Sequence, residues 1–204
     1  MVGNDFVRAV KRAREWHDGQ VRKGSEVPYI SHLLAVASLV LEAGGDEELA
    51  IAALLHDAIE DQPDEASPKK IRKQFGKRVA QIVEECSDRE HGEKSTRANW
   101  RQRKETYIES LEEASDDLLL VSCADKLHNA RSLLRDLAEE GDGVWKRFRE
   151  PDPAKQLWYY RALADAFLER IRKPRWLPVE LDRTVREIEE AAGARTSEAG
   201  RPER

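Results

Sequence analysis

Helix signals recur along this chain while strand signals are almost absent, and this contrast restricts the fold more than any other feature. The segment 5–18 carries apolar residues at helical spacing and is followed by a stop at Gly19. Ser67 and Pro68 form a typical helix start, because serine caps the first turn and proline fits its first position. We therefore predict an all-α fold.

The same signals place the expected helices along the chain. They are predicted over residues 5–18, 31–43, 47–61, 68–75, 78–86, 97–113, 116–137, 153–170 and 178–192. Loops are expected over 21–30 and 87–96, and no internal repeat is present. We therefore expect one helical-bundle domain over 1–192, followed by a polar tail over 193–204 that we predict to be disordered.

The balance of charge argues against nucleic acid as a partner. The 204 residues include 40 acidic and 35 basic side chains, which gives a net charge of −5. Non-specific nucleic-acid binding relies on clustered bases that neutralise phosphates. A phosphorylated small molecule would therefore need a local cluster of bases or a metal ion.

Membrane proteins and disulfide-stabilised scaffolds are also disfavoured. The N-terminal segment has no uninterrupted apolar run, and no stretch approaches the ~18 apolar residues that span a bilayer. Cys86 and Cys123 lie outside any CxxC pair, so we interpret both as reduced core residues. These features predict a cytoplasmic protein without a membrane partner.

The segment AALLHDAIED, residues 52–61, is the most informative for function. An apolar run ends there in four ionisable side chains: His56, Asp57, Glu60 and Asp61. On one continuous helix, His56 would share a face with Glu60, and Asp57 with Asp61. So much charge at the end of a buried helix is costly unless it is compensated. A divalent cation is the natural compensation, because it binds imidazole and carboxylate together.

Two further residues would complete a metal shell between helices. His32 opens the second expected helix, and Asp125 follows the apolar run 118–123. A buried aspartate among leucines is costly unless it is paired or ligated. The alternative is that each is an ordinary hydrogen-bonded polar group. A second His-Asp pair, His17-Asp18, has no acidic partners three or four residues on, and we interpret it as structural.

These motifs resemble the HD-domain metal phosphohydrolases, and more narrowly the hydrolase domain of the RelA/SpoT family. The resemblance rests on HDGQVRKGSEVPYISH (17–32), AALLHDAIED (52–61), Phe75-Gly76 with VAQIVEECSD behind it, and ADKLHNARSL (124–133). Leu33 departs from the family, in which a proline commonly follows the ligand histidine. The length leaves no room for the synthetase and regulatory domains of long members. The chain is therefore expected to be a stand-alone small alarmone hydrolase, similar to the metazoan SpoT homologue.

The resemblance implies a reaction and a metal ion. The family hydrolyses the 3′-diphosphate of (p)ppGpp to GDP or GTP and pyrophosphate. Four ligands would hold the ion, expected to be Mn²⁺: His32, His56, Asp57 and Asp125. Glu60 and Asp61 would orient or deprotonate the attacking water. Two imidazoles and two carboxylates suit Mn²⁺, although zinc would also bind them.

Substrate contacts are expected from residues around these ligands. Arg22 and Lys23 match the family's RK block, in which arginine packs on guanine and lysine meets phosphate. The other expected contacts are Tyr29, Lys94, Lys126 and Asn129, of which Lys94 is a looser match and Arg101 looser still. The aromatic residues over 144–167 are interpreted mainly as core, part of which closes the nucleotide pocket.

Two alternative functions stand beside alarmone hydrolysis. The first is an HD enzyme with another substrate: an NADPH 2′-phosphatase, an adenosine alarmone hydrolase or a nucleotidase. The second is an antitoxin-like protein that binds or degrades alarmone, although a pure binder has no need of the Glu60-Asp61 pair. The last helix, 178–192, either covers the bundle or mediates homo-oligomer formation, and the sequence leaves both open.

Overall fold

The computed structural model describes residues 2–90 and 100–199, without the side chains of 88–90 and 194–199. Its elements are α1 (Asn4–Trp16), α2 (Ile30–Glu42), α3 (Glu47–Leu55), α4 (Ala58–Asp61), α5 (Pro68–Phe75), α6 (Lys77–Glu90), α7 (Trp100–Ser110), η2 (Leu111–Glu113), α8 (Asp116–Glu140), η3 (Gly141–Arg147), α9 (Pro153–Arg170) and α10 (Trp176–Ala199). Within these ranges the one β feature is an isolated bridge between Val21 and Pro28. The predicted all-α fold is confirmed. Among the described helices, none has the length and apolar character required to cross a membrane.

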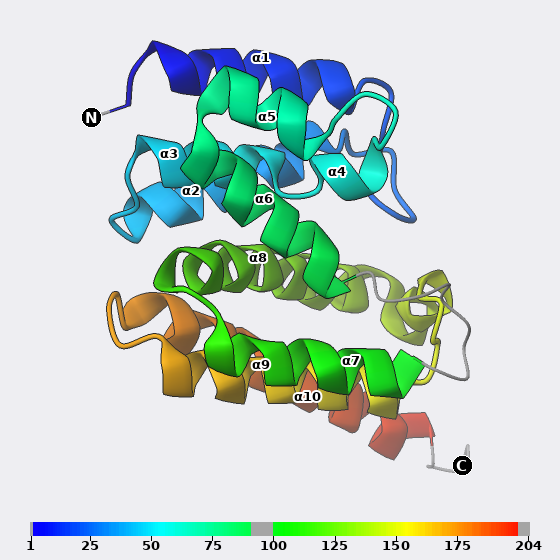
Figure 1. The fold of residues 1–204 in the computed structure, drawn as a ribbon. Coiled ribbons are helices and arrows are strands. Elements are labelled where there is room, and N and C mark those ends of the chain that lie inside the picture. The colour runs from blue at the N-terminus through cyan, green and yellow to red at the C-terminus, as the bar shows by residue number, and fades with distance from the viewer. Residues whose placement is uncertain (1, 91–99, 200–204) are drawn as a thin grey trace.

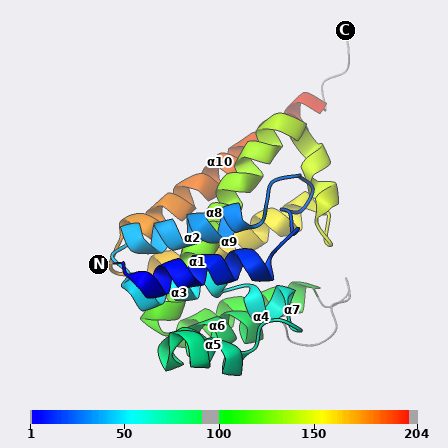
Figure 2. The same cartoon turned by 90° about the horizontal axis from the view of Figure 1, so that it is seen from above.

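Helix α8 runs through the middle of the bundle and separates two layers (Figure 1). The layer formed by α1 to α6 lies on one side, and α7, α9 and α10 lie on the other. Figure 2 shows α10 running alongside α8, with which it makes one of the largest helix contacts. Buried apolar residues cover much of α8, including Leu118, Val121 and Leu127. The two layers therefore share one core.

The helix predicted over 47–61 is wrong in one respect, because the structure divides it. Helix α3 ends at Leu55 and α4 begins at Ala58. The sequence gives no helix breaker between them, since neither glycine nor proline occurs over residues 47–62. The expected pairing of His56 with Glu60 along one uninterrupted helix face therefore does not apply.

Several other helix ends differ from the predicted ones. Helix α6 continues to Glu90, into the expected loop, because no glycine or proline occurs there to stop it. Helix α8 continues to Glu140 and ends at Gly141, whose φ of 62° favours glycine. Helix α10 begins at Trp176, since the first turn of a helix tolerates Pro178. It runs to Ala199, so the first part of the tail predicted to be disordered is helical.

Truncation of Phe167 should test the packing of α9. Phe167 is fully buried in the core. We expect Phe167→Ala to lower the free energy of unfolding by about 3–5 kcal/mol, because it removes apolar burial and leaves a cavity. Val7 is 65% exposed, so Val7→Ala is a control expected to change stability by under about 0.5 kcal/mol. Urea unfolding followed by circular dichroism measures both, and equal losses would contradict the described core.

Candidate active site

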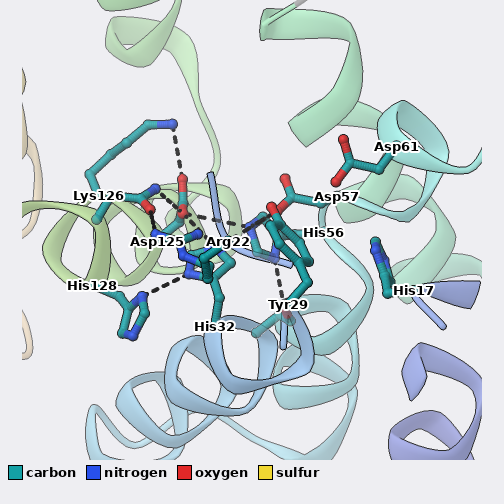
Figure 3. Close-up of polar contacts among 12 residues, drawn as sticks. His17, Arg22, Tyr29, His32, His56, Asp57, Asp61, Asp125, Lys126 and His128 are labelled. Carbon is teal, nitrogen blue, oxygen red and sulfur yellow. Dashed lines mark hydrogen bonds and ion pairs between the residues drawn. The ribbon is translucent and has the colours of Figure 1, made fainter. Parts of the chain in front are cut away.

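Four side chains from distant segments converge beside the middle of α8. His32 lies in the first turn of α2, His56 and Asp57 at the break between α3 and α4, and Asp125 on α8 (Figure 3). His56 Nε2 is 3.0 Å from Asp57 Oδ2 and 3.6 Å from Asp125 Oδ1. His32 Nε2 is 3.1 Å from Asp125 Oδ1 and 3.7 Å from Asp57 Oδ2. The structure thus brings together all four residues expected as metal ligands.

The break between α3 and α4 allows two neighbouring side chains to reach one point. Adjacent residues of a regular helix do not face each other. Asp57 departs from regular helix geometry, with φ −94° and ψ −4°. Helical hydrogen bonding resumes directly after it, because the Asp61 N–H donates to the Asp57 carbonyl oxygen at 2.9 Å. As a result, the polar atoms of His56 and Asp57 converge.

Each imidazole of the cluster is held through its other nitrogen. His56 Nδ1 lies 2.8 Å from the Ala53 carbonyl oxygen, which leaves Nε2 directed at the carboxylates. His32 Nδ1 lies 2.7 Å from Nδ1 of His128. Burial lowers the pKa of His128 to about 4, so this ring is neutral at neutral pH. Hydrogen bonds of this kind fix the orientation of histidines that ligate metals.

The two carboxylates are held by residues expected as substrate contacts. Tyr29 Oη donates to Asp57 Oδ2 at 2.6 Å, and Asn129 Nδ2 donates to Asp125 Oδ1 at 2.6 Å. Lys126 Nζ lies 2.9 Å from Asp125 Oδ2. Tyr29, Lys126 and Asn129 therefore also orient the acidic members of the cluster.

Attraction within the cluster outweighs the cost of burial. Burial opposes charge on Asp57, yet the imidazoles of His56 and His32 hold its pKa well below the usual value. Burial also opposes charge on Asp125, and Lys126 with the same imidazoles holds its pKa well below the usual value. Burial disfavours the His56 imidazolium, but Asp57 and Asp125 raise the pKa of His56 well above the usual value. The two carboxylates therefore require positive charge beside them.

This donor set fits a divalent cation. His56 Nε2 is buried and makes no hydrogen bond of normal geometry with any described residue. One ligand atom each of His32, His56 and Asp57 lies within 4.8 Å of the other two. Donor atoms that each lie about 2.1 Å from one ion are roughly 3 Å apart, close to the shortest distances in the cluster. Nitrogen and oxygen donors without thiolate suit ions such as Mn²⁺ and Zn²⁺.

The two acids of α4 have different surroundings. Glu60 lines the cavity next to the cluster. Asp61 Oδ2 accepts a hydrogen bond from Gln20 Nε2 at 2.7 Å. Desolvation, partly offset by this hydrogen bond, raises the pKa of Asp61, and the charge of Asp57 raises it further. Glu60 is therefore the acid that lines the cavity, whereas Asp61 is not part of the cavity lining.

A cavity of about 870 Å³ adjoins the cluster through Tyr29, Lys126 and Asn129, which line the cavity and contact the two carboxylates. Its walls come from the loop 21–29, the C-terminal half of α8, and parts of α7, η3 and α9. Eight lysine and arginine residues line it against two acids, Glu60 and Asp136. This leaves a surplus of six positive charges inside a protein whose net charge is −5. Such a cavity suits a polyanionic ligand.

Most of the expected substrate contacts border this cavity. The lining includes Arg22, Lys23, Tyr29, Lys126 and Asn129. Arg22 Nη2 donates to Asn129 Oδ1 at 2.7 Å, and its guanidinium lies 5.7 Å from the centroid of the Tyr29 ring. A chain of contacts therefore joins Arg22 through Asn129 to Asp125.

The two looser matches do not extend this set. Lys94 lies outside the described residues. Arg101 packs over the ring of Trp158, 3.2 Å from its centroid, and is not part of the cavity wall. The aromatic segment divides as expected, because Phe167 lies in the core while Tyr159 and Tyr160 line the cavity.

Two residues of this site were not identified from the sequence. His128 follows Asp125 by three positions on a helix, so the shared face could have indicated its contact with the cluster. Gln20 joins His17 Nδ1 to Asp61, with 2.7 Å at each contact, and no sequence pattern predicts it. His17 also stacks on Tyr29, with ring centroids 5.2 Å apart, and its interpretation as structural stays a prediction.

Comparison with known proteins gives a consistent family and fold. A family model described as an HD domain matches residues 9–154. The guanosine-3′,5′-bis(diphosphate) 3′-pyrophosphohydrolase of Haemophilus influenzae is 37% identical over 127 residues, which are 59% of this chain and 17% of that protein. The MESH1 pyrophosphohydrolase of Xenopus tropicalis is 38% identical over 133 residues, which are 64% of this chain and 70% of that protein. The chain thus spans less than a fifth of the long bacterial relative.

Solved structures agree with this assignment. A metazoan SpoT orthologue described as hydrolysing ppGpp superposes with a TM-score of 0.72 and 28% identity, covering 92% of this chain and 97% of its own. A protein of Listeria monocytogenes EGD-e superposes with a TM-score of 0.62 and 30% identity, covering 79% of this chain and 99% of its own.

Divalent metal should stabilise the folded protein through this cluster. At a free concentration of about 100 times Kd, Mn²⁺ added to EDTA-treated protein should raise the free energy of unfolding by about 2.7 kcal/mol. Asp57→Asn should abolish this rise, because it weakens the cluster, whereas the exposed Asp64→Asn should retain it. Thermal unfolding with and without Mn²⁺ measures the effect. Equal responses in the two variants would contradict a metal site here.

Proposed function

Because this chain belongs to the HD-domain family, we propose that it is a metal-dependent guanosine-3′,5′-bis(diphosphate) 3′-pyrophosphohydrolase. The proposed reaction converts ppGpp or pppGpp with water to GDP or GTP and pyrophosphate. We place it in the cytoplasm, as one reaction of the stringent response, and propose Mn²⁺ as the resident ion.

One observation supports this function most strongly. A cluster of two imidazoles and two carboxylates borders a cavity with six surplus positive charges, although the protein as a whole is acidic. A metal centre beside a basic cavity suits a substrate with a polyphosphate group at the reacting end. Relatives of this chain are described as acting on such a substrate.

The metal ligands in this proposal are His32, His56, Asp57 and Asp125. A divalent ion held there would supply Lewis acidity towards a phosphoryl oxygen and towards water. His128 and the Ala53 carbonyl orient the two imidazoles. Tyr29 and Asn129 orient the two carboxylates.

Glu60 is the proposed general base, since its side chain borders the cavity. It would take a proton from the water that attacks the phosphorus on the 3′ oxygen, while the bond between that phosphorus and the 3′ oxygen breaks and the released oxygen takes up a proton from solvent to form the 3′-hydroxyl. Asp61 would assist from its hydrogen bond with Gln20. Arg22, Lys23 and Lys126 would hold the nucleotide through stacking and phosphate contacts. Lys94 remains a predicted phosphate contact.

The reaction itself should require metal. We expect purified protein to convert ppGpp to GDP and pyrophosphate with Mn²⁺ and to leave it intact with EDTA, because the four ligands form the catalytic centre. Ion-exchange chromatography of the nucleotides measures this. Unchanged ppGpp with Mn²⁺, together with turnover of NADPH or an adenosine alarmone in the same assay, would refute the substrate assignment.

Substitution of Glu60 should separate catalysis from metal binding. We expect Glu60→Gln to lower kcat for ppGpp by about 10²–10⁴-fold while Mn²⁺ still raises the melting temperature, since a general base contributes to the chemical step. The exposed Glu65→Gln, the same change five residues on, is the control and should keep full activity. Full activity of Glu60→Gln would assign the base to Asp61, which Asp61→Asn then tests.

A further inference from the structure

The loop between α1 and α2 is folded as a short hairpin. The Tyr29 N–H donates to the Gln20 carbonyl oxygen at 2.9 Å. Nearer the turn, the Arg22 N–H donates to the Val27 carbonyl oxygen at 2.8 Å, and Gly24 turns the chain with φ 77°. The main chain therefore fixes where the side chains of Arg22 and Tyr29 begin, and both of these residues line the cavity.

A side-chain hydrogen bond joins this hairpin to α8, 107 residues further along the chain. Arg22 Nη2 donates to Asn129 Oδ1 at 2.7 Å, and Asn129 Nδ2 donates to Asp125 Oδ1 at 2.6 Å. A guanidinium only donates and a carboxylate only accepts, so the amide between them has one favourable orientation. If it turned over, its oxygen would face the carboxylate and its nitrogen would face the guanidinium. Arg22 thus fixes the group that holds Asp125.

A second contact of Arg22 leads to the other carboxylate. Its guanidinium carbon lies 5.7 Å from the centroid of the Tyr29 ring, within the range of a cation–π contact. The Tyr29 ring also stacks on His17, with ring centroids 5.2 Å apart. These two neighbours keep the tyrosine hydroxyl directed at Asp57 Oδ2, to which it donates at 2.6 Å. Arg22 therefore contacts one residue that holds each carboxylate.

Both chains of contacts end on the carboxylate oxygens that face the imidazoles. Asn129 holds Asp125 Oδ1, which lies 3.1 Å from His32 Nε2. In the other chain, the tyrosine hydroxyl holds Asp57 Oδ2, which lies 3.0 Å from His56 Nε2. Contacts of this kind orient ligating groups, and their loss usually weakens metal binding by about 10–100-fold. A single side chain of the cavity is therefore linked to both anionic ligands of the metal cluster.

We propose that Arg22 is a positioning residue of the metal centre. Through Asn129 and Tyr29 it orients the two ligand carboxylates, and this orientation favours binding of a divalent cation. The positive charge of Arg22 acts in the opposite direction, because it repels a cation. The two contributions must therefore be measured separately. The inference concerns metal binding, so it does not depend on which phosphorylated substrate the cavity takes.

A double-mutant cycle on Mn²⁺ affinity separates orientation from charge. Protein treated with EDTA and dialysed is titrated calorimetrically with Mn²⁺, without nucleotide, as the wild type, Arg22→Gln, Asn129→Leu and the double variant. Loss of the charge changes the Kd alike in both backgrounds, whereas the orienting effect requires Asn129. The factor by which Arg22→Gln raises the Kd should therefore be about tenfold larger in the wild type than in the Asn129→Leu background.

Lys23→Gln provides the matched control cycle. It removes the same charge at the next position of the hairpin, from a residue that also lines the cavity. Within the described part of the chain, no hydrogen bond joins Lys23 to Asn129. The factor by which Lys23→Gln changes the Kd should therefore be the same with and without Asn129→Leu, within about twofold.

The outcomes separate this inference from the proposed function. Coupling confined to the Arg22 cycle supports the inference even if ppGpp is not hydrolysed. Additive effects of Arg22→Gln and Asn129→Leu, equal coupling in the Lys23 cycle, or a wild type that binds no Mn²⁺ would overturn it, even if ppGpp is hydrolysed. Thermal unfolding in EDTA verifies that each variant keeps the fold, and Asn129→Ala takes the place of Asn129→Leu in both cycles if the leucine variant does not fold.

Discussion

Two buried carboxylates that need a positive partner organise the centre of this molecule. Asp57, at the break before α4, and Asp125, on α8, approach each other, and both lie beside the imidazoles of His32 and His56. A tyrosine hydroxyl also donates to Asp57, and an amide and an ammonium group contact Asp125. Without those contacts, the burial of either carboxylate would cost several kcal/mol. The same contacts prepare the cluster for a divalent cation, because such an ion supplies more positive charge than a protonated imidazole. Structural stability and metal binding therefore depend on one set of interactions.

The fold serves this cluster through one long helix and one short interruption. Helix α8 carries Asp125, His128 and Asn129 on one side. Its regular spacing therefore sets how far Asp125, in the cluster, lies from His128 and Asn129, which line the cavity. The interruption after Leu55 does the opposite, since it makes two adjacent side chains converge where a regular helix would separate them. The regular spacing of α8 and the interruption after Leu55 together place four donor groups around one point.

Charge within apolar sequence was the signal that made the cluster predictable. His56 follows Leu54-Leu55 and Asp125 follows Cys123-Ala124, so both positions had to be buried and compensated. The order of the helices followed from caps and stops such as Ser67 and Gly19, although the helix predicted over 47–61 is divided in the structure. The interruption at Asp57 could not be predicted, because its neighbours favour helix and only contacts with distant segments make the break favourable. The basic cavity could not be predicted either, because it exists only once α7 and η3 pack around α8.

The separation of charge between surface and cavity has a consequence for binding. At physiological salt the Debye length is about 8 Å, so exposed acids repel a polyanion only when it comes near the surface. Inside the cavity, the surplus of six positive charges acts at shorter range and in lower dielectric, where attraction is stronger. Because this attraction grows with the charge of the ligand, a nucleotide with several phosphates gains more in the cavity than one with a single phosphate. The basic lining of the cavity, and not the net charge of the protein, therefore favours ligands of high negative charge.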